Sequence, residues 1–215
     1  MLSVREAQQR ILARFSPLEA THIPLERAAG RVLAAAVCAD SDLPPFDNSS
    51  VDGFAVRAAD VAAASPASPV SLPVVGDIPA GSSPDFTLRP GQAARIMTGA
   101  PLPSGADAVV MVEDTDFNQR SSGTAAPSIV RIYWPVREGT HIRERGSDMS
   151  QGSEVFSAAQ RLRAQDIGML AMLGVANVPV YRSPKVAILS SGDEIIPVES
   201  ALTPGKIRDT NTYTL

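Results

Sequence analysis

Residues 43–57 read LPPFDNSSVDGFAVR, and the character of the sequence changes across this stretch. Pro44 and Pro45 remove two backbone donors and favour an extended chain, so no helix passes through it. The Asn-Ser-Ser triple that follows suits a turn, because its short side chains bond to nearby backbone. Gly53 predicts either a positive φ or a close backbone approach beside Asp52. Asp52 is then either a carboxylate held at a loop-to-strand junction to meet a ligand, or a solvated aspartate in a proline-rich connection.

The composition is that of a globular protein, with 44% apolar residues and a net charge of −4 over 215 residues. It has no dense run of Lys or Arg, which argues against a general nucleic-acid surface. We find neither a secretory leader nor an apolar run long enough to span a bilayer, so we expect a cytoplasmic protein without membrane partners. Cys38, the single cysteine, lies in the apolar context AAAVCAD and is expected to be small and buried. His22 and His141 lack the spacing of a zinc site.

Before this stretch the pattern is helical. Ser3 and Glu6 have the spacing of a capping box, which predicts a helix over residues 3–15. Its apolar positions recur at helical spacing: Val4, Ala7, Ile11, Leu12 and Phe15. A second short helix is predicted over residues 25–37, with Pro24 at its first turn.

After Phe54 the pattern is of short β segments separated by Pro and Gly, with loops expected at 59–69 and 119–127. The predicted strands are residues 70–75, 93–97, 108–112 and 129–134. Together these features predict a small β domain inserted into a helical frame.

Two motifs within this region carry polar groups suited to an anion. Thr98 and Gly99 follow a strand end, where a hydroxyl and free backbone N–H groups can hold an oxyanion such as phosphate; the alternative is an ordinary proline-fixed turn. Farther on, EGTHIRERGSDMSQG places Arg143, Arg145 and Asp148 within six residues. Such arginines either clamp an oxyanion with paired hydrogen bonds or form weak surface ion pairs with neighbouring carboxylates.

The last third of the sequence predicts the beginning of an α/β domain. A helix over residues 158–173 ends at Gly174 and leads to strands at 178–181 and 186–189. The second strand ends in SSGDE, and ligands of open α/β sheets gather beyond the carboxyl ends of strands. The candidate residues there are Ser190, Ser191, Asp193 and Glu194, followed by Asp209 and Asn211 at the next strand end.

Carboxylate oxygens at such an edge could take Mg²⁺, and an ordinary acidic loop is the alternative. Two or three strands without a return helix would leave an open sheet edge, so we expect the sequence to be part of a longer protein.

Five motifs in order, PPFDNSSVDGFAVR, RIMTGAPLPSGADAVVMVEDT, IRERGSDMSQG, SSGDEI and IRDTN, make the chain resemble the molybdopterin molybdotransferase family of the MoeA type, which includes the E domain of gephyrin. The resemblance covers nearly the whole chain and corresponds to the N-terminal half of the family. It implies a multidomain protein of α+β and α/β class. A helical linker domain (1–45 plus 141–175) would carry an inserted β domain (46–140), followed by the start of a three-layer, molybdopterin-binding-like α/β domain (176–215).

The resemblance implies insertion of molybdate into adenylylated molybdopterin with release of AMP, dependent on Mg²⁺. It also implies a homodimer with a site shared between subunits, and a molybdopterin-adenylating protein as the upstream partner. Carried over by position, Asp52, Thr98 and Asp148 would be catalytic and Glu194 would bind the metal. The substrate-binding residues would be Arg143, Ser190, Ser191, Asp193, Asp209 and Asn211.

Asp52 would either orient water or bond the pterin, and phosphoanhydride cleavage needs charge neutralisation more than a covalent nucleophile. Ser191 stands where the family commonly has threonine, and the family's C-terminal half lies outside the sequence, so we expect these 215 residues alone to be inactive. Two other readings are a non-catalytic, gephyrin-like scaffold and an oxyanion- or pterin-binding module. Peptide binding without adenylate hydrolysis would favour the first, and binding of molybdate alone would favour the second.

Overall fold

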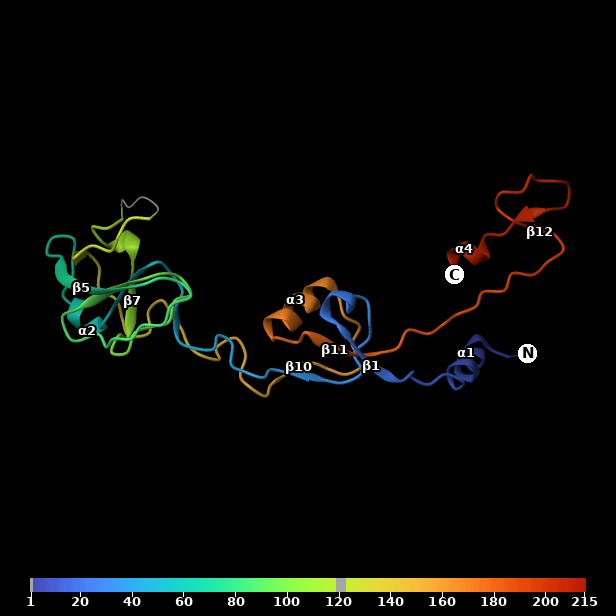
Figure 1. The fold of residues 1–215 in the computed structure, drawn as a ribbon, viewed down its shortest axis with the longest axis horizontal. Helices are drawn as coiled ribbons and strands as arrows, with labels where there is room; N and C mark the ends of the chain where they lie inside the picture. The colour runs from blue at the N-terminus through green and yellow to red at the C-terminus, as the bar shows by residue number, and fades with distance from the viewer. Residues whose placement is uncertain (1, 119–122) are drawn as a thin grey trace. The chain divides into compact units, whose positions relative to one another are not determined.

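The computed structural model describes residues 2–118 and 123–215, which form a mixed α and β protein (Figure 1). The chain divides into two compact units: the N-terminal segment to Ala35 together with Ala158–Leu215 (unit 1), and Ala36–Ser157 (unit 2). The three-domain boundaries expected from the sequence stay predictions. Within the described ranges, no helix has the length and apolar character needed to cross a membrane.

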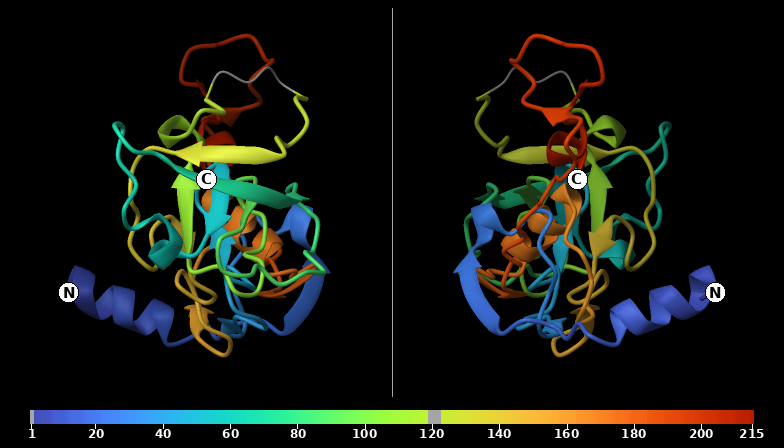
Figure 2. Two further views of the ribbon diagram at one scale, coloured as in Figure 1. Left: turned by 90° about the vertical axis from the view of Figure 1, so that its left-hand side faces the viewer. Right: turned by 90° about the vertical axis from the view of Figure 1, so that its right-hand side faces the viewer.

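Unit 2 is built on a five-stranded sheet in which the strand order is β7-β4-β6-β5-β8. β4 lies antiparallel to both β6 and β7, β5 pairs parallel with β6, and β8 pairs antiparallel with β5. Figure 2 shows β5 and β8 running across the direction of β4 and β7, so the sheet is strongly curled. The strands are β4 (Gly53–Val56), β5 (Val70–Ile78), β6 (Ala93–Ile96), β7 (Ala108–Met111) and β8 (Ile129–Ile132). The predicted strands of the β region are therefore confirmed, with shifts of a few residues at their ends.

Both faces of this sheet are covered, because alternate residues of β4 enter two different clusters. Phe54 and Val56 pack with the buried residues of β7 and β8, while Ala55 packs on the other face with residues of β6 and the following loops. The Phe54 ring also meets Phe117 edge-to-face, with ring centroids 5.9 Å apart. A four-residue strand with no exposed position thus forms the centre of unit 2.

The loops of the β region differ in part from expectation. The short helix α2 (Ala58–Val61) occupies the start of the predicted loop at 59–69, because Val61 is fully buried against the sheet. A 3-10 turn, η2 (Val112–Asp114), follows β7. The predicted loop at 119–127 lies partly outside the described residues.

Two short strand pairs complete unit 2 beyond the sheet. β3 (Asn48–Ser49) pairs with β9 (Ile142–Arg143), and β2 (Val37–Cys38) pairs with β10 (Glu154–Phe156). Cys38 was expected to be buried, but it is exposed because its side chain lies on the outer side of β2.

Unit 1 has a small core between one helix and one strand pair. Its elements are α1 (Val4–Leu12), β1 (Ala20–Pro24), η1 (Leu25–Arg27), α3 (Ala164–Met172), β11 (Asn177–Tyr181), β12 (Ile195–Ile196), β13 (Ile207–Arg208) and α4 (Asn211–Thr214). β1 pairs antiparallel with β11, and Leu33, Leu162 and Leu170 are almost fully buried beside them. The capping box of α1 is confirmed, since Ser3 and Glu6 exchange both bonds.

Three expectations for unit 1 are wrong. The helix predicted over 25–37 is only the η1 turn, because the backbone of Leu33 bonds instead to Gln160, at 2.9 Å, and to Ala159. The helix predicted over 158–173 begins at Ala164, since Ala159 has a φ of 66° and the Leu162 N–H bonds to Arg31.

The third is the buried strand at 186–189. It forms no strand, and Val186 and Leu189 are 76% and 92% exposed. A buried strand needs covering layers on both faces, and residues 186–215 provide only a parallel two-residue pair, β12 with β13, and one helical turn.

Candidate functional site

The predicted site residues fall into two sets, one in each unit. Unit 2 contains Asp52, Thr98, Arg143 and Asp148. Unit 1 contains Ser190, Ser191, Asp193, Glu194, Asp209 and Asn211. Each set is described within its own unit.

In unit 2, the sequence-distant residues Asp52 and Thr98 lie in direct contact. Both the backbone N–H and the hydroxyl of Thr98 donate to Oδ1 of Asp52, at 2.9 and 2.7 Å. Because the hydroxyl proton of Thr98 is directed at Asp52, the oxygen lone pairs of Thr98 are what it can offer to a ligand. The arrangement makes Asp52 a fixed acceptor at the start of β4.

The backbone next to Asp52 is fixed by its neighbours in the sheet. The Asp52 carbonyl accepts from Val112 N–H at 3.0 Å. A Cβ on Gly53 would lie 2.0 Å from the Val110 carbonyl oxygen, so glycine is needed here for close strand approach rather than for a positive φ. Of the two roles predicted for Gly53, the structure selects the close approach.

The turn that carries Thr98 is joined to β3. Gly99 N–H donates to Ser49 O at 2.8 Å, and Ser49 N–H donates to Ala100 O at 3.1 Å. On its other side β3 pairs with β9, with Asn48 opposite Arg143. Asn48 and Ser49 are both buried, although polar, and their hydrogen bonds hold the two motifs on either side of one segment.

Arg143 and Asp148 form an ion pair within their loop. The guanidinium Nη2 lies 2.5 Å from Oδ2 of Asp148, and the side chains are 51% and 57% exposed. An ion pair this exposed contributes little to stability. An arginine in such a pair can exchange the carboxylate for a ligand oxyanion, which leaves both readings of the motif open.

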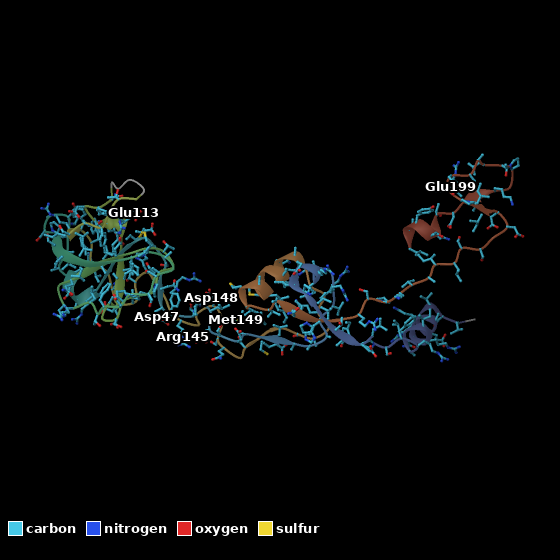
Figure 3. All side chains as sticks on the ribbon, viewed as in Figure 1. Asp47, Glu113, Arg145, Asp148, Met149 and Glu199 are labelled. Carbon is cyan, nitrogen blue, oxygen red and sulfur yellow. The ribbon has the colours of Figure 1, made fainter. Side chains whose placement is uncertain are left out.

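Sequence reasoning missed two carboxylates that hold this loop, Asp42 and Asp47. Asp42 accepts from the Arg145 side chain at 2.6 Å and from Gln151 N–H at 2.8 Å, and Asp47 accepts from Arg145 N–H at 2.7 Å. Figure 3 labels Asp47, Arg145 and Asp148 close together along these paired segments. The Gln151 N–H and then the Arg145 guanidinium lower the pKa of Asp42 below its usual value. The signal in the sequence is the pair of aspartates that bracket the two prolines.

In unit 1, Ser190 and Asp209 lie in direct contact, although the strand predicted before Ser190 does not form. Ser190 Oγ donates to Oδ1 of Asp209 at 3.1 Å, and the Thr212 hydroxyl donates to Oδ2 at 2.5 Å. The Thr212 hydroxyl is the largest cause that lowers the pKa of Asp209. These groups border a cavity of about 290 Å³, which is lined by Ser190, Ile195, Ile196, Pro197, Val198, Asp209, Thr212 and Tyr213.

The acidic pair of SSGDE is arranged differently from a ready metal cage. The Asp193 carbonyl accepts from Lys206 Nζ at 2.5 Å, and the Glu194 carboxylate folds back over Gly192. Ser191 is exposed, and Asn211 begins α4. Among residues 2–118 and 123–215, no three His, Cys, Asp or Glu side chains gather in a group that could hold a metal ion.

The chain thus contains a curled β unit, with the Asp52 carboxylate fixed next to its central strand, and a second unit with a cavity bordered by Ser190 and Asp209. Residues 2–174 match the family described as the MoeA N-terminal region (domain I and II). The chain therefore belongs to the MoeA family, whose N-terminal region it contains.

Named relatives and solved structures agree with this assignment. The chain is 40% identical over 215 residues to molybdopterin molybdenumtransferase 2 of Mycobacterium tuberculosis, covering all of this chain and 51% of that protein. It is 44% identical over 194 residues to the molybdopterin molybdenumtransferase of Nostoc sp. PCC 7120, covering 90% of this chain and 42% of that protein. The crystal structure of the molybdopterin biosynthesis MoeA protein from Pyrococcus horikoshii OT3 superposes with a TM-score of 0.85 and 34% identity, over 99% of this chain and 55% of that one. The chain thus spans about half the length of these relatives.

Proposed function

We propose that this chain supplies the N-terminal part of a transferase of molybdenum cofactor biosynthesis. The reaction proposed is insertion of molybdate into adenylylated molybdopterin, with release of AMP. The names of the relatives support it, and the observation that carries it to particular atoms is the Asp52–Thr98 pair. Two motifs 46 residues apart in the chain meet at one carboxylate oxygen. Holding both segments in this position costs conformational entropy. A side chain fixed in this way is suited to position a reacting ligand.

In this proposal the groups of unit 2 act on an anionic ligand. Asp52 accepts a hydrogen bond from a ligand, either an attacking water or the pterin, while Thr98 fixes its orientation. Arg143 releases Asp148 and clamps a ligand oxyanion, since a guanidinium can form paired hydrogen bonds with a carboxylate or with a phosphate-like group. Asp148 is then free to act as a second acceptor. These roles assign positioning and charge neutralisation to the protein, which is what adenylate cleavage requires.

The groups of unit 1 are proposed to bind the substrate and its metal. Ser190 and Asp209, which line the cavity described above, would contact the ligand, and we propose that Ser191, Asp193 and Asn211 contact it as well. Glu194 would hold Mg²⁺, which in proteins commonly takes one or two carboxylates and completes its shell with substrate phosphates and water. The exposed Glu194 carboxylate fits that pattern, since the side chains of residues 2–118 and 123–215 do not by themselves form a complete cage. When bound, Mg²⁺ would neutralise charge on the adenylate phosphate.

The proposal extends to the assembly of the protein. It places the working enzyme in the cytoplasm as a homodimer with a site shared between subunits, and it makes a molybdopterin-adenylating protein the source of the substrate. Size-exclusion chromatography with light scattering of the full-length gene product tests the dimer. A strict monomer that is fully active would contradict the shared site.

The direct test is molybdate insertion by the full-length gene product carrying Asp52→Ala, Thr98→Val or Glu194→Ala. We expect each to lower kcat at least tenfold, and Glu194→Ala to raise the Mg²⁺ concentration needed for half-maximal rate. The matched control is Asp85→Ala, which removes an exposed carboxylate from the same unit as Asp52. Wild-type turnover in Asp52→Ala and Glu194→Ala, with unchanged Mg²⁺ dependence, would remove both residues from the site. Calorimetric binding of molybdate in the absence of the adenylylated pterin, together with no turnover, would favour an oxyanion-binding module instead.

A further inference from the structure

The segments on either side of the β unit run antiparallel to each other over most of their length. β2 pairs with β10 at one end, β3 pairs with β9 at the other, and Leu43 bridges to Met149 between them. Leu43 exchanges backbone bonds with Met149, and its carbonyl also accepts from Asp148 N–H at 2.9 Å. The loop that carries Arg143 and Asp148 is therefore one side of a two-stranded connection.

This loop is not held by apolar burial. Between Arg143 and Gln151, only Gly146 and Met149 are even half-buried, and every other residue is exposed. Its conformation must then come from hydrogen bonds, because few apolar contacts oppose its opening.

Among the side chains of the facing segment, Asp42 is the one that bonds to the loop at two places. Its Oδ2 accepts from Arg145 Nε at 2.6 Å, and its Oδ1 accepts from Gln151 N–H at 2.8 Å. Its own side chain is 20% exposed, whereas that of Arg145 is 63% exposed. Gly146 has a φ of 72° and lies close to Asp42: a Cβ added to it would be 3.5 Å from the Asp42 carboxyl carbon. One carboxylate thus joins Arg145 to Gln151, and Asp148 lies between these two attachment points.

We infer that Asp42 is a positioning residue for the anion-binding loop: by joining Arg145 to Gln151 it holds Arg143 and Asp148 in the geometry that receives the substrate. The inference rests on the proposed function of that loop. Only a carboxylate does this, because both of its oxygens accept. An asparagine keeps an acceptor for Gln151 but turns an N–H₂ toward the Arg145 guanidinium, where two donors then face each other. The same two partners, first the Gln151 N–H and then the Arg145 side chain, lower the pKa of Asp42 and so favour its charged form.

The first measurement is amide hydrogen exchange of the 215-residue chain carrying Asp42→Ala or Asp42→Asn. We expect exchange of the Arg145–Gln151 amides to become about tenfold faster in both, the size of effect that loss of a charged hydrogen bond produces. Asp77→Ala is the matched control, since Asp77 pairs with Arg95 at 2.5 Å within the five-stranded sheet, to which β9 and this loop do not belong. In the control the loop amides should exchange at the wild-type rate.

The second measurement is the rate of molybdate insertion by the full-length gene product, compared with its melting temperature. We expect Asp42→Ala to lower kcat/KM about tenfold with little change in melting temperature, and to have no further effect when Asp148→Ala is already present. If Asp42 only stabilised the fold, Asp42→Ala would lower the amount of folded enzyme equally in the wild-type protein and in the Asp148→Ala variant. Asp42→Glu, which restores the charge, should recover part of the rate.

The outcomes separate the inference from the function on which it rests. If Asp148→Ala is impaired but Asp42→Ala leaves loop exchange unchanged, or if the two effects multiply, Asp42 is not a positioning residue and the proposed function stands. If Arg143→Ala and Asp148→Ala both turn over at the wild-type rate, the proposed role of the loop fails and the inference fails with it. Faster loop exchange combined with non-additive kinetics supports the inference.

Discussion

Gly53→Ala should be among the most destabilising single methyl additions in unit 2. The added Cβ would lie 2.0 Å from the Val110 carbonyl oxygen and 2.9 Å from its carbonyl carbon. Both are backbone atoms of β7, so no side-chain rotation relieves the contact. β4 must instead move away from β7, although it is fully buried and paired on both sides.

The cost follows from two contributions. Overpacking a well-packed core costs about 1–3 kcal/mol. Separating the strands weakens about two ladder hydrogen bonds near Gly53, at about 1 kcal/mol each. Together we expect a loss of about 3–5 kcal/mol in the free energy of unfolding. Gly76→Ala is the matched control on β5. The three heavy atoms nearest to its Cβ all belong to the Phe86 ring, the first at 2.4 Å, and this partly buried ring can shift, so we expect a loss of about 1 kcal/mol.

Urea unfolding of the 215-residue chain measures both variants. Trp134 is the single tryptophan and belongs to unit 2, so its fluorescence follows the unfolding of that unit. With a slope of about 1–3 kcal/mol per molar urea, the Gly53→Ala midpoint should fall by about 1 M or more, and the Gly76→Ala midpoint by much less. A Gly53→Ala protein within about 1 kcal/mol of wild type, or less affected than Gly76→Ala, would refute the steric argument.

Three further predictions concern single side chains of the two units. Phe54→Ala should cost about 3–5 kcal/mol in the same urea assay, because it empties a fully buried position and removes the edge-to-face contact with Phe117; a loss below 1 kcal/mol would show that the site collapses. The pKa of Asp166 is lowered from 3.8, first by the Arg163 side chain and then by the Arg163 backbone N–H. The stability that the Asp166 carboxylate contributes is therefore fully present above pH 3.8 and is lost as the pH falls through the lower pKa of the folded state. Melting curves between pH 2 and 5 should therefore show a smaller acid-induced decrease for Asp166→Asn than for wild type, and an unchanged decrease would contradict this. Gly168→Ala within α3 should stabilise unit 1 by about 0.5–1 kcal/mol, since beyond the adjacent residues and the helix's own backbone no atom lies within 4 Å of the new Cβ; a lower melting temperature would contradict it.

Much of the local structure follows from the sequence. The short, β-rich segments between Pro and Gly predicted the strands of the curled sheet, and the Ser3–Glu6 spacing predicted the start of α1. These features depend on residues close together in the chain, where alternation, capping and breaking residues act directly. The helix at 25–37 failed because its backbone finds partners more than a hundred residues away, as Leu33 does with Gln160.

The candidate site, like the fold, was predicted only in part from the sequence. Asp52, Thr98, Arg143 and Asp148 were singled out from their motifs and from the family resemblance. A surface ion pair was one of two alternatives predicted for Arg143, whereas the contact between Asp52 and Thr98 was not predicted. Asp42 was missed although it and Asp47 bracket the two prolines, because its hydrogen-bond partners Arg145 and Gln151 lie about a hundred residues later in the chain.

The sequence by itself determined the kinds of element in this protein and the residue types that its motifs offer to a ligand. Only the tertiary structure decided that Thr98 donates to Asp52 and that Gly53 is required where β4 approaches β7. It also decided that Asp42 bonds to the loop that carries Arg143 and Asp148. The physical reason is the separation along the chain over which each kind of interaction acts. Propensity and periodicity act over a few residues, whereas each of these contacts joins segments that only the folding of the chain brings within hydrogen-bonding distance.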